Sequence, residues 1–408
     1  MKNYSPVIYV ALPAMNEADY ITDFIACLKS QIYNNYKLFV CVNQPDNYWD
    51  DPEKVHICKN NKRTIEFLKS LQGIDIEIID KSSRGEGWNG KRNGVGWARK
   101  LLMDKISHEA KDDDLIVSLD ADTTFSPHYF SSLIESFKFR QKAVALSVPY
   151  YHNLTGDEIA DRAILRYEIY LRYYNLNMLR IGSPYAFTAI GSAIVLPVKS
   201  YKAIGGMTPH KSGEDFYFLQ KLRKYGDIIL WNSEKVFPAA RFSDRVDFGT
   251  GPAMIKGRAG DWSSYPIYPF QYFDEIKQLF DLFPGLYEKT LSTPVDTFLE
   301  EKFGNADIWS PLRKNSKKKE QFIKACHHKF DAFRSFQYLK WRHENDVEKS
   351  SEENLIEFIN IEYTKSLNYT LLDNFNFSNT SIKILNDIRD FLLKEEEVKQ
   401  KKTSIKSE

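Results

Sequence analysis

The stretch Asp114-Leu115-Ile116-Val117-Ser118-Leu119-Asp120-Ala121-Asp122 decides the fold, because a short apolar run ends here on two carboxylates. Such a run, bounded by charge, is typical of a buried strand in a parallel sheet. In open α/β sheets, ligands bind just outside the carboxyl ends of the strands. Two carboxylates at such an end can hold a divalent cation through oxygen ligands, and the cation would neutralise a diphosphate. The stretch therefore makes Asp120 and Asp122 candidate metal ligands and points to nucleotide-sugar chemistry.

A second Asp-x-Asp pattern, Asp112-Asp113-Asp114, precedes the same strand. At the amino end of a strand we expect a solvated turn and no ligand. The pattern alone occurs by chance in most chains of this length. The context that distinguishes Asp120 and Asp122 is the strand before them and the turn expected after them at 123–127.

Elements of an α/β fold surround this strand. Apolar runs predict further strands, and apolar residues at helical spacing predict helices between them. The expected strands are 7–12, 36–42 and 74–79, then 143–148, 189–196 and 227–231. The expected helices are 18–31, 61–71, 95–108, 127–139, 157–179, 201–206 and 216–224. The alternation implies parallel strands joined by right-handed crossovers.

The composition changes near residue 270, where the patterns become helical and rich in lysine and glutamate. The segment before it, 249–269, is rich in Gly, Pro and Trp and is expected to be a loop. Helices are expected beyond it, and no further strand; their ranges are 273–283, 294–302, 317–345, 352–366 and 380–399. We therefore predict one domain over 1–268 and an α-helical region with a charged tail over 269–408.

Composition excludes several classes of protein. A net charge of +1 over 408 residues gives no electrostatic case for a nucleic-acid partner. No signal peptide and no run of transmembrane length is present, so at most a peripheral contact with a membrane is left open. Four cysteines without a CxxC spacing indicate reduced, mostly buried thiols and a cytoplasmic protein. They are Cys27, Cys41, Cys58 and Cys326.

Four motifs, taken in order, resemble those of the family-2 glycosyltransferases of the GT-A fold. They are Pro13-Ala14-Met15-Asn16-Glu17, Asp120-Ala121-Asp122, Gly205-Gly206 and Gly213-Glu214-Asp215. None is specific alone, but their order and spacing fit, and the resemblance covers about residues 6–250. It implies an α/β fold with a Rossmann-like, mixed, mainly parallel sheet flanked by helices, here with an α-helical C-terminal extension.

The resemblance also implies a reaction: an inverting, metal-dependent transfer of a sugar from a nucleotide-diphosphate donor to an acceptor hydroxyl. It makes Asp122 the main ligand of Mn²⁺ or Mg²⁺, with Asp120 nearer the ribose or the metal's waters. Asp215 becomes the general base, which must reach the acceptor proton, and Glu214 orients the acceptor or the base. Taken alone, Glu214-Asp215 would be interpreted as an acidic first turn of a helix.

Further candidates for nucleotide binding follow the first two strands. Pro13, Asn16 and Glu17 lie where a nucleotide would lie, although Asn16-Glu17 also fits a helix N-cap with an acidic first turn. Asn43 stands where the family usually has an aspartate that reads the nucleobase. An amide both donates and accepts, so Asn43 could read a pyrimidine edge, but it leaves the donor nucleotide open.

The Gly-rich basic loop 84–96 could cradle phosphates at the start of a helix. Its end, Gly94-Val95-Gly96-Trp97-Ala98-Arg99, resembles the family's Gly-x-x-x-Ala-Arg-Asn stretch, with Lys100 in place of Asn. Arg99 then contacts the diphosphate or the base. The alternative register uses Arg92-Asn93 instead, but the spacing from Arg99 to Asp120 fits one helix and one strand better.

Two further features stay open. His210 could touch the metal, a phosphate or the acceptor, although a lone loop histidine more often does none of these. Arg241, Arg245 and Trp262 follow the catalytic helix, where a loop could close over donor and acceptor; the alternative is an ordinary surface loop. Glycines that would permit this motion are Gly249, Gly251, Gly257 and Gly260.

The expected partners are a nucleotide-sugar donor and a carbohydrate or lipid-linked acceptor, and no oligomeric state is predicted. Two other functions are considered. One is a GT-A-like binding or scaffold protein without transfer activity, which the presence of Asp215 disfavours. The other is a nucleotidyltransferase, which lacks support because no basic signature loop follows the first strand.

Overall fold

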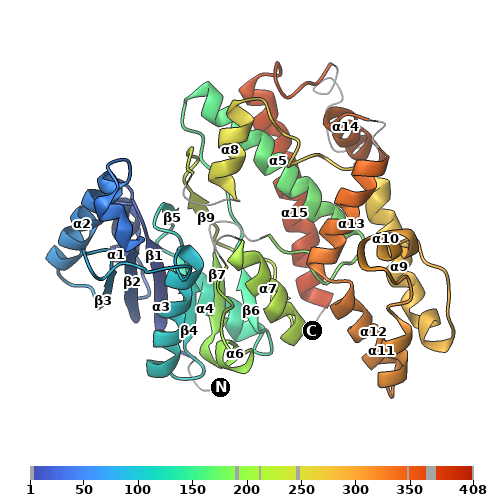
Figure 1. Ribbon diagram of the computed structural model, residues 1–408, viewed down its shortest axis with the longest axis horizontal. Helices are drawn as coiled ribbons and strands as arrows, with labels where there is room; N and C mark the ends of the chain where they lie inside the picture. The colour runs from blue at the N-terminus through green and yellow to red at the C-terminus, as the bar shows by residue number, and fades with distance from the viewer. Residues whose placement is uncertain are drawn as a thin grey trace. The chain divides into compact units, whose positions relative to one another are not determined.

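The apolar runs of the first half of the chain build one mixed sheet. The computed structural model describes residues 4–188, 193–210, 213–244, 249–346, 349–363 and 374–406. Within these residues the main sheet has seven strands in the order β3-β2-β1-β4-β7-β6-β8 (Figure 1). The strands are β1 (Ile8–Ala14), β2 (Tyr36–Asn43), β3 (Ile76–Lys81), β4 (Leu115–Ser118), β6 (Ala145–Ser147), β7 (Ile194–Pro197) and β8 (Ile228–Ile229).

Helices alternate with these strands. They are α1 (Ile21–Lys29), α2 (Val55–Ser70), α3 (Val95–Glu109), α4 (Tyr129–Phe139), α5 (Glu158–Arg180), α6 (Val198–Ala203) and α7 (Glu214–Tyr225), with a short 3₁₀ helix η1 (Asp46–Asp50). Helix α3 packs on β1 and β2, and α7 packs on β6. Of the strand predicted at 189–196, residues 189–192 lie outside the described residues, and the remainder belongs to β7.

Strand β1 is the axis of the sheet. It pairs in parallel with β2 on one side and with β4 on the other, and Ala14 lies opposite Val42 while Ala11 lies opposite Ser118. Every residue of β1 and β4 is buried, as expected for strands covered on both faces. The loops after β1, β2 and β4 therefore leave the sheet at one edge, where sequence analysis places most of the candidate site.

The remaining pairings mix directions. Strand β2 pairs in parallel with β3, and β6 with β8, whereas β7 runs antiparallel to both β4 and β6. The predicted fold class, a mixed and mainly parallel sheet flanked by helices, is confirmed.

Two predictions about loops are wrong. Residues 123–127 were expected to be a turn, but Thr123–Phe125 form strand β5, which pairs antiparallel with β9 (Val236–Pro238). The segment 249–269 was expected to be a loop, but it contains helix α8 (Thr250–Arg258). Its Pro252 lies in the first helical turn, where the missing N–H removes no helical hydrogen bond. The proline that favoured a loop in the prediction is therefore compatible with the start of α8.

The second Asp-x-Asp pattern is a turn, but it is not fully solvated as predicted. Asp114 is buried; its Oδ1 accepts from the Val7 amide at 2.8 Å and its Oδ2 from the Lys111 amide at 2.9 Å. Asp112 and Asp113 pair at the surface with lysines. The pattern thus anchors the start of β4.

The chain divides into two compact units. The first comprises Met1–Ile164, Phe187–Ala259 and Ser404–Glu408, and the second Leu165–Ala186 and Gly260–Thr403. Sequence analysis placed a single boundary near residue 268. The second unit also contains Leu165–Ala186, which includes the end of α5, so it is formed from two separate segments of the chain. No helix in the described part of the chain is long and apolar enough to span a membrane.

The second unit is helical in its described residues, as predicted. Its helices are α9 (Phe270–Glu288), α10 (Asp296–Phe303), α11 (Ser310–Asn315), α12 (Lys319–Lys329), α13 (Ala332–Asn345), α14 (Ser351–Glu362) and α15 (Ile382–Lys406). The single helix predicted over 317–345 is wrong, because the chain breaks between α12 and α13. Asp331 caps α13 there by accepting a hydrogen bond from the Arg334 amide, which favours a new helix start.

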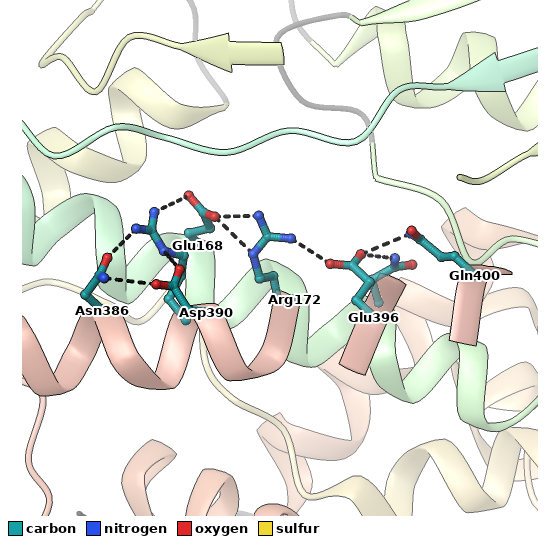
Figure 2. A network of polar contacts seen from close by, with 8 residues as sticks. Glu168, Arg172, Asn386, Asp390, Glu396 and Gln400 are labelled. Atoms are coloured by element: carbon teal, nitrogen blue, oxygen red, sulfur yellow. Dashed lines mark hydrogen bonds and ion pairs between the residues drawn. The ribbon is translucent and has the colours of Figure 1, made fainter. Parts of the chain in front are cut away.

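A buried network of charges joins α5 to α15 within the second unit (Figure 2). Arg172 donates through Nε to Glu168 Oε1 at 3.0 Å and through Nη1 to Glu396 Oε2 at 2.7 Å. Arg389 Nη1 lies 3.4 Å from Glu168 Oε2. All four side chains are almost fully buried. Because each glutamate has a basic partner, the network compensates the desolvation of its charges and fixes α15 against α5.

We expect Arg172→Met to lower the free energy of unfolding by about 3 kcal/mol or more, because it leaves Glu168 and Glu396 buried with less compensation. Urea denaturation followed by circular dichroism measures the change. The control is Lys383→Ala on the partner helix α15, which breaks only the exposed pair with Asp387 and should change stability by less than about 0.5 kcal/mol. Equal stability of the Arg172 variant and the wild type would contradict the assignment.

Candidate active site

The loop after β1 turns sharply at the sheet edge. Asn16 adopts a left-handed conformation with φ 61°, which asparagine tolerates better than most residues. Its amide donates to Asn61 Oδ1 at 2.8 Å, and the Glu17 carbonyl accepts from Ile21 at 2.9 Å as α1 begins. Asn16 and Glu17 are not the N-cap and acidic first turn that the alternative interpretation predicted, because α1 begins at Ile21 with Tyr20 as its N-cap. The turn leaves the Glu17 side chain buried at this edge.

Arg99 connects two motifs that are far apart in the sequence. It lies on α3 with 1% of its surface exposed. Its Nη2 donates to Asp120 Oδ1 at 2.7 Å, and its Nη1 donates to Glu214 Oε1. Burial alone would lower the pKa of Arg99. The negative charges of Glu214, Asp120 and Asp215 outweigh this effect and raise the pKa, so the guanidinium stays charged. One side chain therefore joins the Asp-x-Asp motif to the start of α7.

The alternative register for the basic loop does not reach this cluster. Asn93 Nδ2 donates to the Gly90 carbonyl at 2.7 Å, and the Arg92 guanidinium stacks over Trp97. Of the two registers considered, it is Arg99 that the structure brings to Asp120.

Asp215 follows Glu214 in the first turn of α7. The N-cap of this helix is Gly213 in a left-handed conformation with φ 70°, which glycine adopts without strain. Burial raises the pKa of Asp215 from 3.8 to about 7; the charge of Glu214 adds to the increase and that of Arg99 opposes it. A carboxyl group that titrates near neutral pH can accept a proton and release it, as a general base must.

Arg241 makes a second bridge, which sequence analysis did not find. Its Nη2 lies 2.7 Å from Glu17 Oε1 and 2.6 Å from Asp122 Oδ2, and its guanidinium covers the ring of Tyr20. Burial alone would lower the pKa of Arg241, but Asp122 and Glu17 raise it. The sequence singled out Arg241 only as part of a loop, because its partners lie more than 100 residues away.

The start of α3 and the segment before α7 are in close contact. A Cβ at Gly96 would lie 2.2 Å from the His210 carbonyl oxygen, so only glycine fits there. The His210 ring packs against Tyr217 of α7, with ring centroids 4.6 Å apart. Gly96 thus allows α3 to carry Arg99 close to Glu214. The described contacts of His210 are with Gly96 and Tyr217.

The side chain of Asn43 is committed to the protein itself. Asn43 is 2% exposed; its Nδ2 donates to the Ala14 carbonyl at 3.1 Å, and its Oδ1 accepts from Trp88 Nε1 at 3.2 Å. It therefore links the ends of β1 and β2 to the loop that carries Trp88. Pro13 is buried within β1 opposite Cys41.

The described residues could bind a divalent cation only together with phosphate oxygens of a substrate. Among the described residues, no group of three or more acidic, histidine or cysteine side chains converges on a metal position. Mg²⁺ is, however, commonly bound through one or two carboxylates together with substrate phosphates. Asp122 together with a donor diphosphate would make up such a ligand set, although Arg241 pairs with Asp122 here as Arg99 pairs with Asp120.

Comparison with known proteins shows what the first part of the chain is similar to. Residues 9–205 match the family model described as glycosyl transferase family 2. No curated protein matches the chain. Similar solved structures include S. aureus TarS 1–349 in complex with UDP-GlcNAc, with 11% identity over 95% of this chain and 92% of that chain and a TM-score of 0.40. Another is GalNAc-T7 with UDP, GalNAc and Mn²⁺, with 13% identity over 80% and 58% and a TM-score of 0.39. Scores this low establish no common fold by themselves.

Asp215→Asn should stabilise the protein in a pH-dependent manner. In the wild type, folding favours the protonated form of Asp215. The stability that this protonation contributes is fully present below pH 3.8 and is lost as the pH rises through about 7, whereas the asparagine does not titrate. In a chelating buffer we expect the variant to melt at a higher temperature than the wild type at pH 8. The difference should shrink toward pH 5, and a difference that does not change with pH would contradict the raised pKa.

Asn43→Asp tests whether this residue reads a base or supports the fold. A buried carboxylate facing the Ala14 carbonyl loses a hydrogen bond and is repelled by the carbonyl oxygen. We therefore expect the free energy of unfolding, measured by thermal denaturation, to fall by about 2 kcal/mol or more. The exposed Asn34→Asp is the control and should be nearly neutral. Unchanged stability together with tighter nucleotide binding would instead indicate that residue 43 reads the nucleobase.

Proposed function

Because residues 9–205 match the family model described as glycosyl transferase family 2, we propose that the protein transfers a sugar from a nucleoside-diphosphate donor to an acceptor hydroxyl with inversion. The observation that carries the proposal is the Arg99 bridge. The chemistry needs a site for the leaving diphosphate beside a base for the acceptor, and Arg99 holds Asp120 and Glu214 on one guanidinium.

Asp215 is the proposed general base. It removes the proton from the acceptor hydroxyl as that oxygen attacks the anomeric carbon, and a single displacement with one base inverts the configuration. Its pKa of about 7 matches this role near neutral pH. Glu214 is paired with Arg99 and 4% exposed, so we assign it to orienting the base.

Metal dependence follows from a count of charges. In the described cluster the carboxylates, five in all, outnumber the two guanidinium groups, so negative charge is in excess there. A donor diphosphate is itself an anion, so its binding here calls for an additional cation, which we propose to be Mn²⁺ or Mg²⁺ held by Asp122. Such a cation stabilises charge on the leaving diphosphate. The seven residues are Glu17, Asp120, Asp122, Glu214, Asp215, Arg99 and Arg241.

The remaining assignments are broader. We propose that the end of β1 and the loop after it, from Pro13 to Glu17, lie along the nucleotide together with Asp120. We also propose that the acceptor is a carbohydrate or a lipid-linked carbohydrate. The cysteines Cys27, Cys41, Cys58 and Cys326 are free thiols, in keeping with the proposed cytoplasmic location.

We expect Asp215→Asn and Asp122→Ala each to reduce turnover by about 10²-fold or more, because one removes the base and the other the cation ligand. The assay measures release of nucleoside diphosphate from a panel of nucleotide sugars with Mn²⁺ or Mg²⁺, with added sugars or water as acceptor. Asp113→Asn, in the exposed aspartate pattern, is the control and should keep wild-type turnover. Wild-type turnover of the Asp215 variant would refute the base assignment.

A thermal-shift screen with nucleoside diphosphates and metal separates the alternatives, because ligands that bind the native state raise its melting temperature. Binding without turnover of any donor would support the scaffold function instead. A nucleoside triphosphate consumed with release of pyrophosphate would support a nucleotidyltransferase.

A further inference from the structure

Arg241 reaches the Asp-x-Asp motif by a route that is fixed in the backbone. Strand β5 begins directly after Asp122 and pairs with β9, with Thr123 opposite Pro238. The ladder continues one step further, where the Ala239 amide donates to the Asp122 carbonyl at 3.1 Å. Arg241 follows two residues later, so this two-stranded ribbon sets the register between Arg241 and Asp122.

The contacts of Arg241 use only part of its donor capacity. Its described hydrogen bonds and ion pairs to Glu17 and Asp122 all involve Nη2, at 2.6–2.9 Å. Its Nε is buried and has no hydrogen-bond partner among the described residues. A guanidinium offers five donors in a planar fork that matches phosphate oxygens. Arg241 is thus charged, held in position and able to donate further hydrogen bonds.

We propose that Arg241 is a ligand of the donor diphosphate, which Glu17 and Asp122 hold in place until the donor binds. This inference rests on the proposed function and adds a residue to its site. Asp122 can serve a divalent cation only by sharing its carboxylate with Arg241 or by releasing it. Once Asp122 is engaged, Glu17 and the Tyr20 ring still retain the guanidinium beside the diphosphate. The arginine then supplies positive charge to the leaving group.

The proposal predicts opposite effects on two ligands. In Arg241→Gln, Asp122 loses its competing cation, so Mn²⁺ alone should bind several-fold more tightly than to the wild type. Inorganic pyrophosphate in saturating Mn²⁺ should bind about tenfold or more weakly, because charge-assisted hydrogen bonds are lost. Isothermal titration calorimetry measures both. A merely structural arginine would misplace Asp122 on removal and weaken both ligands together, and that outcome, or unchanged pyrophosphate binding, would overturn the proposal.

Glu17→Gln is the second variant and keeps the test decisive if Arg241→Gln fails to fold. The glutamine oxygen can still accept from Arg241 Nη2 and so retain the guanidinium, but the competing negative charge is lost. Pyrophosphate should therefore bind at least as tightly as to the wild type, and weaker binding would overturn the proposal. Arg63→Gln, which breaks only an exposed pair with Asp19, is the matched control for lost charge. A wild type that binds pyrophosphate with Mn²⁺ but releases no nucleoside diphosphate from any donor would refute the proposed function without touching this inference.

Discussion

The first unit depends on the burial of Arg99 between Asp120 and Glu214. A buried guanidinium is tolerated only when it is paired, and here its two partners come from the end of β4 and the start of α7. Removing the arginine would leave two carboxylates facing one another beside Asp215. The pairing therefore holds the Asp-x-Asp motif close to Glu214 and to the neighbouring Asp215, the proposed base, and it requires the close approach of α3 to the His210 backbone that Gly96 permits.

Arg241 repeats this arrangement at the next carboxylates. The cluster alternates acid and base, from Glu17 through Arg241 to Asp122, and from Asp120 through Arg99 to Glu214. Alternation relieves repulsion between neighbours but leaves an excess of negative charge. A site of this kind attracts cations and repels free anions, so an anionic donor and a cation are expected to bind together.

Sequence patterns predicted what local physics determines. Apolar runs located β1, β2 and β4, and their parallel pairing placed Asn16, Asn43 and Asp122 at one edge. The patterns could not show that β5, only three residues long, pairs with β9, because strand periodicity needs a longer run. Consequently Arg241 had no visible partner in the sequence. For the same reason the commitment of the Asn43 amide to Ala14 and Trp88 stayed hidden, since it depends on a loop that returns to the sheet.

The two units use the same buried chemistry to different ends. In the second unit Arg172 and Arg389 balance Glu168 and Glu396, so the core of the network is neutral and its role is to hold two helices together. In the first unit the carboxylates of the described cluster outnumber its arginines, and burial raises the pKa of Asp215 to about 7. Balanced charges serve stability, whereas an unbalanced cluster lowers it and persists where the imbalance is used. Among the described residues, the cluster around Arg99 and Arg241, rather than the network on α15, therefore has the excess of carboxylates that the proposed binding of a cation with an anionic donor would use.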